Sequence, residues 1–166
     1  LIKNIAHLVG VSIETEPVNW QQHQQDLKDG IRDIASGATY TDARAEYVYF
    51  SVPYRYEENS LFMMNNSIKE LSFESISEFL AQVRLQNFVL GITKGFIYAD
   101  PQINLFIKDE ANNDIIVAYE NDVAALHGLI HGEIDGFISD RIVGAAAILT
   151  QKVDAHIKEV QLNIKT

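Results

Sequence analysis

The sequence predicts an α/β protein built from two similar lobes, and two observations support this fold class. Short runs of branched and aromatic residues alternate with helical patterns along the chain, which favours parallel α/β architecture over a β-sandwich. One arrangement also occurs twice: a helix, a G-x-x-D junction, a strand and then polar residues. The junctions are Gly30 to Asp33 and Gly132 to Asp135, and their separation of 102 residues (135 minus 33) suits two lobes rather than a solenoid repeat.

The first copy begins with a helix and a short strand. Asn19 is a suitable N-cap for a helix over Trp20–Asp29, and Gly30 stands where a residue in the left-handed conformation would end it. A brief, largely apolar run follows at Ile31 and 34–36. Such a run is typical of a buried parallel strand, and we therefore expect one here.

A polar turn and a second helix complete the first copy. Gly37 lets the backbone turn at little steric cost, and Thr41 can cap a helix over about Asp42–Val48 that carries Arg44 in its first turn. Ligands of open α/β sheets bind beyond the carboxyl ends of the strands, where free N–H groups of helix starts point at them. We therefore expect Gly37, Thr39 and Arg44 to lie at a site that binds an anion.

The second copy lies in the downstream half of the chain. The pattern predicts a helix over Glu120–His131 that ends at Gly132, and a strand over Ile134–Ile138 that leads into Asp140. Asp140 then begins the next helix. A cation from the first copy, Arg44, and an anion from the second, Asp140, would face a shared cleft.

The remaining elements are predicted from the same periodic patterns. In chain order they are a helix over 1–8 that stops at Gly10, strands over 11–16 and 60–65, a helix from Ser75 to near Gln82, a strand over 87–92, a helix over 99–107, and strands over 114–119 and 160–164.

The composition of the chain argues against several classes of function. The net charge is −10, and 13 basic residues scattered among 23 acidic ones form no basic stripe, which argues against nucleic acid as a partner. No apolar run approaches the roughly 20 residues of a membrane span, and no signal-peptide pattern is present, as in a mature or trimmed exported domain. Because the chain contains no cysteine, it has neither disulfides nor thiol nucleophiles.

Catalytic, cofactor and metal motifs are not found. The sequence contains no G-x-S-x-G, H-E-x-x-H or P-loop pattern, and we predict no catalytic residue and no cofactor. His127 and His131 share a helix face, as zinc ligands often do, but no third ligand stands at a convincing spacing. Two histidines near a helix C-terminus also complement the helix dipole, so we predict no metal site.

As a set, these motifs resemble the type 2 periplasmic solute-binding proteins, especially the amino-acid-binding group called family 3. The family runs helix, G-x-x-D, strand, small polar residues, T-x-x-R and F-S-x-P-Y. This chain supplies Gly30, Asp33, Ser36, Gly37, Thr39, Thr41, Arg44, Phe50, Ser51, Pro53 and Tyr54. The G-x-x-x-G turn over 91–95 and the segment 132–140 extend the resemblance over nearly the whole chain.

The resemblance implies two α/β lobes joined by crossing strands, which close on a small polar solute in the periplasm or elsewhere outside the cytoplasm. Arg44 would bind the carboxylate of the ligand in a bidentate pair, and Thr39 and the backbone of Gly37 would complete that polar shell. Asp140 would bind an α-ammonium group. Trp20 falls where the family often stacks an aromatic or apolar side chain on the ligand.

The chain departs from the family at several points. The spacing from Asp33 to Arg44 is one residue shorter than usual, and Phe96 and Ile97 stand where the family commonly has threonines that bind the carboxylate. We count Ile97 among the ligand-contacting residues, as an apolar side chain. The family's first strand is missing, and so are the return strand and closing helices after 160–164, as in a fragment of a longer protein.

The resemblance also divides the chain. Residues 1–59 would form lobe one, incomplete at its N-terminus, residues 60–65 a hinge strand, and residues 66–166 lobe two.

Each of these residues also has a purely structural explanation. Arg44 would be an ordinary solvated helix residue, Asp140 an N-cap, and Trp20 a cover for the edge of the core. The small residues over 36–39 would form an ordinary turn, and Ile97 would be an ordinary buried side chain.

Three classes of function therefore compete. The leading one is a module that captures a small, amino-acid-like carboxylate for a membrane ABC transporter or as the sensing domain of a receptor. The second is an enzyme on the same fold, such as a dehydratase of a cyclic carboxylic acid. The third is a protein that has lost its ligand and acts through protein contacts. The ligand is open, because Arg44 suggests an anion, Asp140 an amine, and Phe96 with Ile97 a less polar surface.

Overall fold

The computed structural model describes the backbone of residues 2–165 and the side chains of residues 2–162. The chain divides into two compact units, residues 1–52 and 53–166, which we call unit 1 and unit 2. The predicted division into 1–59, a hinge strand over 60–65, and 66–166 stays a prediction.

Unit 1 consists of helices and loops in the part that the structure describes. Its helices are α1 (Ile2–Leu8), α2 (Trp20–Lys28) and α3 (Asp42–Ala45). The predicted caps are confirmed: Asn19 accepts a hydrogen bond from the backbone N–H of Gln22, and Thr41 accepts one from that of Arg44. Gly10, Gly30 and Gly37 adopt positive φ values of 75°, 69° and 77°, as expected of residues that end a helix or form a turn.

Two strands predicted in unit 1, over 11–16 and over 31–36, are wrong. A strand is stable only when neighbouring backbone pairs with its N–H and C=O groups, and no strand is assigned anywhere between residues 2 and 52. The apolar run is also not buried, because Ile31 is 70% exposed and Ile34 is 57% exposed. The third helix is shorter than predicted, since it ends at Ala45 rather than Val48.

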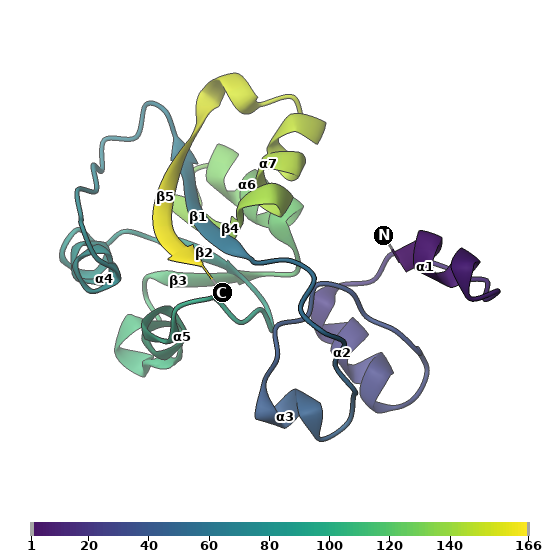
Figure 1. The fold of residues 1–166 in the computed structure, drawn as a ribbon. Coiled ribbons are helices and arrows are strands. Elements are labelled where there is room, and N and C mark those ends of the chain that lie inside the picture. The colour runs from purple at the N-terminus through teal and green to yellow at the C-terminus, as the bar shows by residue number, and fades with distance from the viewer. Residues whose placement is uncertain (1, 166) are drawn as a thin grey trace. The chain divides into compact units, whose positions relative to one another are not determined.

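Unit 2 is a five-stranded sheet with helices on both faces (Figure 1). The strands are β1 (Glu58–Met64), β2 (Leu90–Thr93), β3 (Ile116–Tyr119), β4 (Gly136–Asp140) and β5 (Ile157–Lys165), in the spatial order β3-β2-β4-β1-β5. The helices are α4 (Ile76–Leu85), α5 (Pro101–Lys108), α6 (Asp122–Ile130) and α7 (Arg141–Thr150), with short 3₁₀ turns at Glu110–Asn112 and Asp154–His156.

Every element predicted in unit 2 is present, with boundaries shifted by up to three residues. Ser75 caps α4 as expected, by accepting a hydrogen bond from the N–H of Glu78. The strand predicted from Asn87 begins only at Leu90, because Asn87 has a φ of +46° in the turn after α4. Gly132, with a φ of +73°, ends the second-copy helix in the way that Gly30 ends the first-copy helix.

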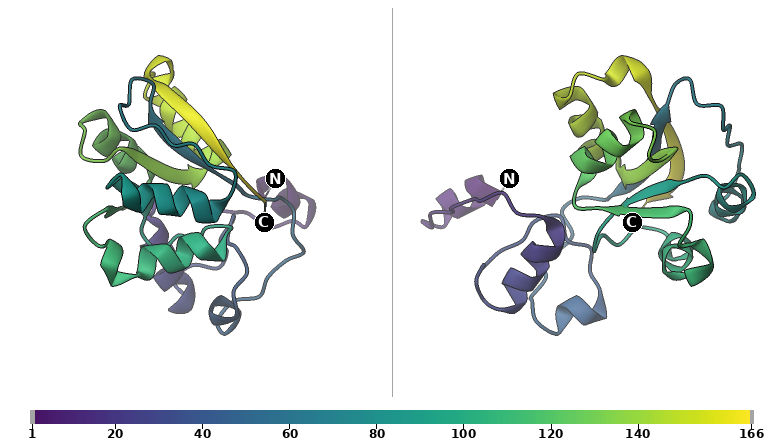
Figure 2. Two further views of the ribbon diagram at one scale, coloured as in Figure 1. Left: turned by 90° about the vertical axis from the view of Figure 1, so that its left-hand side faces the viewer. Right: turned by 180° about the vertical axis from the view of Figure 1, so that it is seen from behind.

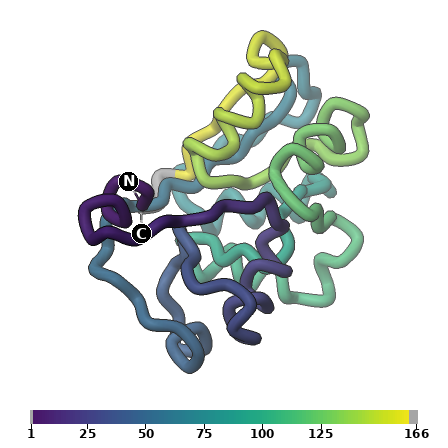
Figure 3. The backbone as a smooth tube through the Cα atoms, turned by 90° about the vertical axis from the view of Figure 1, so that its right-hand side faces the viewer, coloured from purple at the N-terminus to yellow at the C-terminus, as the bar shows by residue number. Residues whose placement is uncertain are grey.

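The sheet is mixed, and the expectation of a parallel sheet holds only in part. Strand β2 is parallel to β3 and β4. Strand β1 is antiparallel to both of its neighbours, β4 and β5, so it alone runs against the other four. Figure 3 shows β1 and β5 side by side.

Successive side chains of β1 pack alternately into two separate hydrophobic cores. Leu61 and Met63 pack with α4 and α5 in one core, whereas Phe62 packs with α6 and α7 in the other, and Figure 2 shows the two helix pairs on opposite faces of the sheet. Helix α7 approaches the sheet closely at Gly144, where an added Cβ would lie 2.3 Å from Cε2 of Phe62. Helices therefore pack against both faces of the sheet.

Candidate ligand-binding site

One edge of the sheet in unit 2 collects polar residues. Because β2, β3 and β4 are parallel and β1 runs the other way, the carboxyl ends of the first three and the start of β1 lie at this edge. Asn59 of β1 is the register partner of Asp140 at the end of β4. This is the edge at which open α/β sheets bind ligands.

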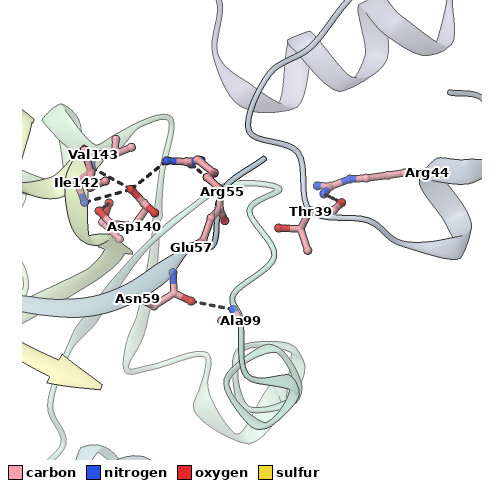
Figure 4. Close-up of polar contacts among 10 residues, drawn as sticks. Thr39, Arg44, Arg55, Glu57, Asn59, Ala99, Asp140, Ile142 and Val143 are labelled. Carbon is pink, nitrogen blue, oxygen red and sulfur yellow. Dashed lines mark hydrogen bonds and ion pairs between the residues drawn. The ribbon is translucent and has the colours of Figure 1, made fainter. Parts of the chain in front are cut away.

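Asp140 is the central group of this edge. It is buried, with 3% of its surface exposed. Its Oδ1 atom accepts hydrogen bonds of 3.1 Å from the backbone N–H groups of Ile142 and Val143, at the start of α7 (Figure 4). Its Oδ2 atom accepts no hydrogen bond from the residues that the structure describes. The structural role as an N-cap thus uses one oxygen and leaves the other available.

Two further charged residues, Arg55 and Glu57, lie next to Asp140. Arg55 Nη2 forms an ion pair with Glu57 Oε1 at 2.7 Å, and Arg55 Nη1 lies 3.8 Å from Asp140 Oδ1. Both residues come from the segment that leads into β1, and Figure 4 shows the guanidinium beside the Asp140 carboxylate. Neither residue was predicted from the sequence to be part of a site.

A network of buried hydrogen bonds holds the loop after β2 in place. Tyr98 is 2% exposed, and its hydroxyl accepts a hydrogen bond from the N–H of Thr93 and donates one to the carbonyl of Ile138. Burial raises the pKa of Tyr98 well above its ordinary value, so the hydroxyl stays protonated at neutral pH. The N–H of Ala99 donates to Asn59 Oδ1 at 2.7 Å.

This loop carries Phe96 and Ile97. The ring of Phe96 packs against the ring of Tyr98, with centroids 5.0 Å apart, so its side chain contributes to the core. Ile97 is half-buried. Its contact with a ligand stays a prediction.

A second carboxylic acid, Asp122, lies near Asp140. Burial raises the pKa of Asp122, a hydrogen bond with Ser139 lowers it, and the negative charge of Asp140 raises it further. The sequence placed Asp122 only within a helix. Its pairing with the end of β4 depends on the fold, and no local pattern could have revealed it.

In unit 1 the structure brings together three of the predicted site residues. Arg44 is 8% exposed, so it is not an ordinary solvated helix residue. Its Nη1 donates a hydrogen bond of 2.8 Å to the carbonyl of Thr39 (Figure 4), and its guanidinium carbon lies 5.5 Å from the ring centroid of Trp20. Gly37 lies in the turn just before Thr39. This group combines a cation, an aromatic ring and a polar turn.

A separate groove in unit 1 contains none of these residues. It lies between α2 and α3, has a volume of about 510 Å³, and is lined by side chains that include Gln24, Gln25 and Tyr47. The hydroxyl of Tyr47 donates to Gln24 Oε1 across this groove. Its walls combine these amides with the charged side chains of Lys28 and Glu46, and we assign it no ligand.

No group of three or more histidine, aspartate and glutamate side chains is placed to hold a metal ion between residues 2 and 165. His131 Nδ1 instead lies 2.8 Å from the carbonyl oxygen of His127. No helix in the same part of the chain is long and apolar enough to cross a membrane.

The fold and this polar edge define the periplasmic-binding-protein class, and comparison with known proteins gives the family. The chain belongs to the bacterial extracellular solute-binding proteins, family 3, which it matches over residues 1–164. The family predicted from the motifs is therefore confirmed. No curated protein matches the chain at a significant level.

Several solved structures share the fold. An ancestral arginine-binding protein bound to glutamine is 22% identical with a TM-score of 0.76, and the match covers 99% of this chain and 67% of that one. A histidine kinase sensor domain with similarity to periplasmic binding proteins is 17% identical with a TM-score of 0.76, covering 96% and 64%. A substrate-binding protein of an ABC uptake transporter from Streptococcus pneumoniae, with bound histidine, is 24% identical with a TM-score of 0.74, covering 98% and 63%.

These matches confirm the two-lobed α/β fold class. The chain spans about two thirds of the length of these structures, between 63% and 67%. At such identities the likeness concerns the fold, and the ligand has to be argued from the residues of this chain.

Proposed function

We propose that the chain is an extracytoplasmic domain that reversibly binds a small amino acid, without turnover, for uptake by an ABC transporter or for ligand sensing. Membership of an extracellular solute-binding family supports capture of a solute outside the cytoplasm. The neighbours are described as binding glutamine, arginine or histidine, which supports an amino acid as the ligand. The same neighbours are binding proteins or a sensor domain, which favours binding over catalysis.

The observation that carries the proposal is the state of Asp140. A buried carboxylate is costly unless its charge is compensated. Two N–H groups of α7 fix Oδ1 and orient the side chain, while Oδ2 accepts nothing from the residues that the structure describes. A protonated amine supplies the positive charge and the N–H donors that such an oxygen requires. We therefore assign Asp140 to the α-ammonium group of the ligand.

Arg44 is the group that we propose for the ligand carboxylate. Its contact with the carbonyl of Thr39 orients the guanidinium, which also lies over the ring of Trp20. A guanidinium presents five N–H donors in a planar fork, a geometry that matches a carboxylate in a bidentate pair. Gly37 and Thr39 would add polar contacts, and Trp20 and Ile97 would contact the apolar part of the ligand.

Transport and sensing both follow from ligand binding, and each has support. The likeness to a substrate-binding protein of an ABC uptake transporter supports transport. The likeness to a histidine kinase sensor domain supports sensing. The two differ in the partner: a membrane permease in transport, or a signalling domain in sensing.

The test is a ligand screen on the chain followed by calorimetry. L-arginine, L-glutamine, L-histidine and L-lysine would be compared with small carboxylates and polyamines by thermal shift. A true ligand at 100 times its Kd should stabilise the native state by about 2.7 kcal/mol, because it binds only the folded protein. Release of a new product from the bound carboxylate would contradict the proposal and favour an enzyme.

Arg44→Ala tests the assignment of the carboxylate. We expect it to abolish the stabilisation by carboxylate-bearing ligands while the protein remains folded. Arg32→Ala is the control, since it removes an arginine of the same unit that pairs with Asp26 and Glu16, and it should leave affinity unchanged. Wild-type affinity in Arg44→Ala would refute the assignment.

A further inference from the structure

We propose that Arg55 is an internal cation that competes with the ligand ammonium group for Asp140. Glu57 weakens this competition, because its ion pair with Arg55 keeps the guanidinium away from Asp140. The inference rests on the proposed function, because it assumes that Asp140 binds an ammonium group. It assigns to two residues outside the predicted site a role in ligand affinity and selectivity.

The first support is the unequal sharing of Arg55 between two carboxylates. Its Nη2 lies 2.7 Å from Glu57 Oε1, within hydrogen-bond distance. Its Nη1 lies 3.8 Å from Asp140 Oδ1, which is close enough for attraction but too far for a hydrogen bond. Arg55 therefore forms a hydrogen-bonded ion pair with Glu57, and its contact with Asp140 is a longer electrostatic one.

The second support is the difference in exposure among the three side chains. Those of Glu57 and Asp140 are 11% and 4% exposed, whereas that of Arg55 is 33% exposed. The two carboxylates are held in the protein, and the guanidinium lies partly in water. Arg55 is thus the member of the group that can shift position when another cation arrives.

The consequence is a lower affinity for amines than Asp140 alone would give. A positive charge 3.8 Å from Oδ1 offsets part of the field that would attract an ammonium group to Oδ2. Because both cations need the same carboxylate, the cost of ligand binding includes weakening the contact with Arg55. A ligand without an ammonium group does not compete with Arg55 and is unaffected.

Glu57 acts on this competition through Arg55. The 2.7 Å pair keeps the guanidinium on the Glu57 side. If Glu57 lost its charge, Arg55 would have Asp140 as its nearest carboxylate, and the internal pair would tighten. Glu57 thus favours binding of the ligand ammonium group by Asp140, and Arg55 opposes it.

The experiment measures Kd by calorimetry on the chain at low salt. The probes are the tightest binder among L-arginine, L-glutamine, L-histidine and L-lysine, and the analogue of that amino acid without its α-ammonium group, which is glutaramate in the case of glutamine. Arg55→Gln should bind the amino acid about threefold to tenfold more tightly, and Glu57→Gln about threefold more weakly, as is typical of partly exposed pairs. Neither change should alter binding of the analogue by more than about twofold.

Two controls separate this role from a general effect of charge. Arg141→Gln removes a positive charge from the residue next to Asp140, but Arg141 pairs with Glu58 and Glu159 and should leave the Kd unchanged. Arg55→Lys keeps the charge and should restore affinity close to wild type. In the background of Arg55→Gln, Glu57→Gln should weaken binding of the amino acid by less than it does in the wild type, because the contact through which Glu57 holds Arg55 is already lost.

The binding results separate failure of this inference from failure of the proposed function. Weaker or unchanged binding of the amino acid by Arg55→Gln, with normal binding by the wild type, would overturn this inference alone. An equal gain in Arg141→Gln would overturn it as well, since the effect would then be a property of net charge. A wild-type chain that binds none of the four amino acids would overturn the proposed function and this inference together.

Discussion

Asp140→Asn separates the structural role of Asp140 from its proposed role in binding. The substitution keeps the shape of the side chain and an oxygen at the position of Oδ1, so the N–H groups of Ile142 and Val143 keep their acceptor. Asparagine and aspartate are about equally good N-caps. What the variant loses is the negative charge at the end of β4.

The structure sets the expected magnitudes. Loss of the charge weakens the interaction with the α7 dipole by about 0.3–1 kcal/mol, and loss of the 3.8 Å pair with Arg55 costs less than about 1 kcal/mol because Arg55 is one-third exposed. Removal of a buried charge also relieves its desolvation cost, so we expect the free energy of unfolding to fall by no more than about 1 kcal/mol. Ligand binding loses a charge-assisted hydrogen bond of about 1.5–3 kcal/mol, which corresponds to a Kd raised roughly 10- to 150-fold.

The assay combines urea denaturation with calorimetry, and Asp140→Ala is the matched variant. Alanine cannot cap a helix, so Asp140→Ala should lose about 0.5–2 kcal/mol through the cap in addition to the charge, and binding should fall at least as far. Two results would refute the reasoning: a Kd in Asp140→Asn within about twofold of wild type, or equal losses of stability in the two variants.

Two further predictions concern the surroundings of the site. Gly144→Ala should lower the free energy of unfolding by about 1–3 kcal/mol, because its Cβ would lie 2.3 Å from the buried Phe62 ring; urea denaturation checks this, and unchanged stability would show that α7 can move away from β1. Asp122→Asn should stabilise the protein at pH 7 but not below pH 3.8, because burial raises the pKa of Asp122 above its ordinary value of 3.8, so the folded state binds the proton more tightly and stability falls as pH rises through that window. Urea denaturation at both pH values measures this, and an equal gain at both would contradict it.

The sequence predicted features that depend on neighbouring residues. The N-caps at Asn19, Thr41, Ser75 and Asp140 are all present, because a cap joins a side chain to a backbone N–H two or three residues away. Gly30, which was predicted to adopt the left-handed conformation, also does so. These features need no knowledge of the rest of the fold.

Features that depend on distant residues were predicted less well. The strands expected over 11–16 and 31–36 failed, because an apolar run does not reveal whether another strand lies beside it. The antiparallel direction of β1 was missed for a similar reason. Side chains alternate between the two faces in the same way whether a strand is parallel or antiparallel to its neighbours. Arg55 was overlooked because its partner Asp140 lies 85 residues further along the chain (140 minus 55).

The predicted site residues fall between these extremes. Local motifs predicted Arg44, Thr39 and Trp20 as site residues, and within unit 1 the Arg44 side chain contacts the backbone carbonyl of Thr39 and the ring of Trp20. Asp140 was predicted, from the second copy of the helix–strand arrangement, to begin the helix that follows the strand. Its capping hydrogen bonds at the start of α7 agree with that position. The binding roles of all these residues, and the shared cleft, stay predictions for the experiments above.

The alternation of side chains along β1 limits how this chain can change in length. Insertion of one residue between Leu61 and Phe62 would send every later side chain of the strand to the opposite face, so residues shaped for one core would enter the other. Hydrogen bonding to β4 and β5 leaves the strand no free side on which to loop out an extra residue. Added residues are better accommodated in the loop that follows Met64, before α4 begins.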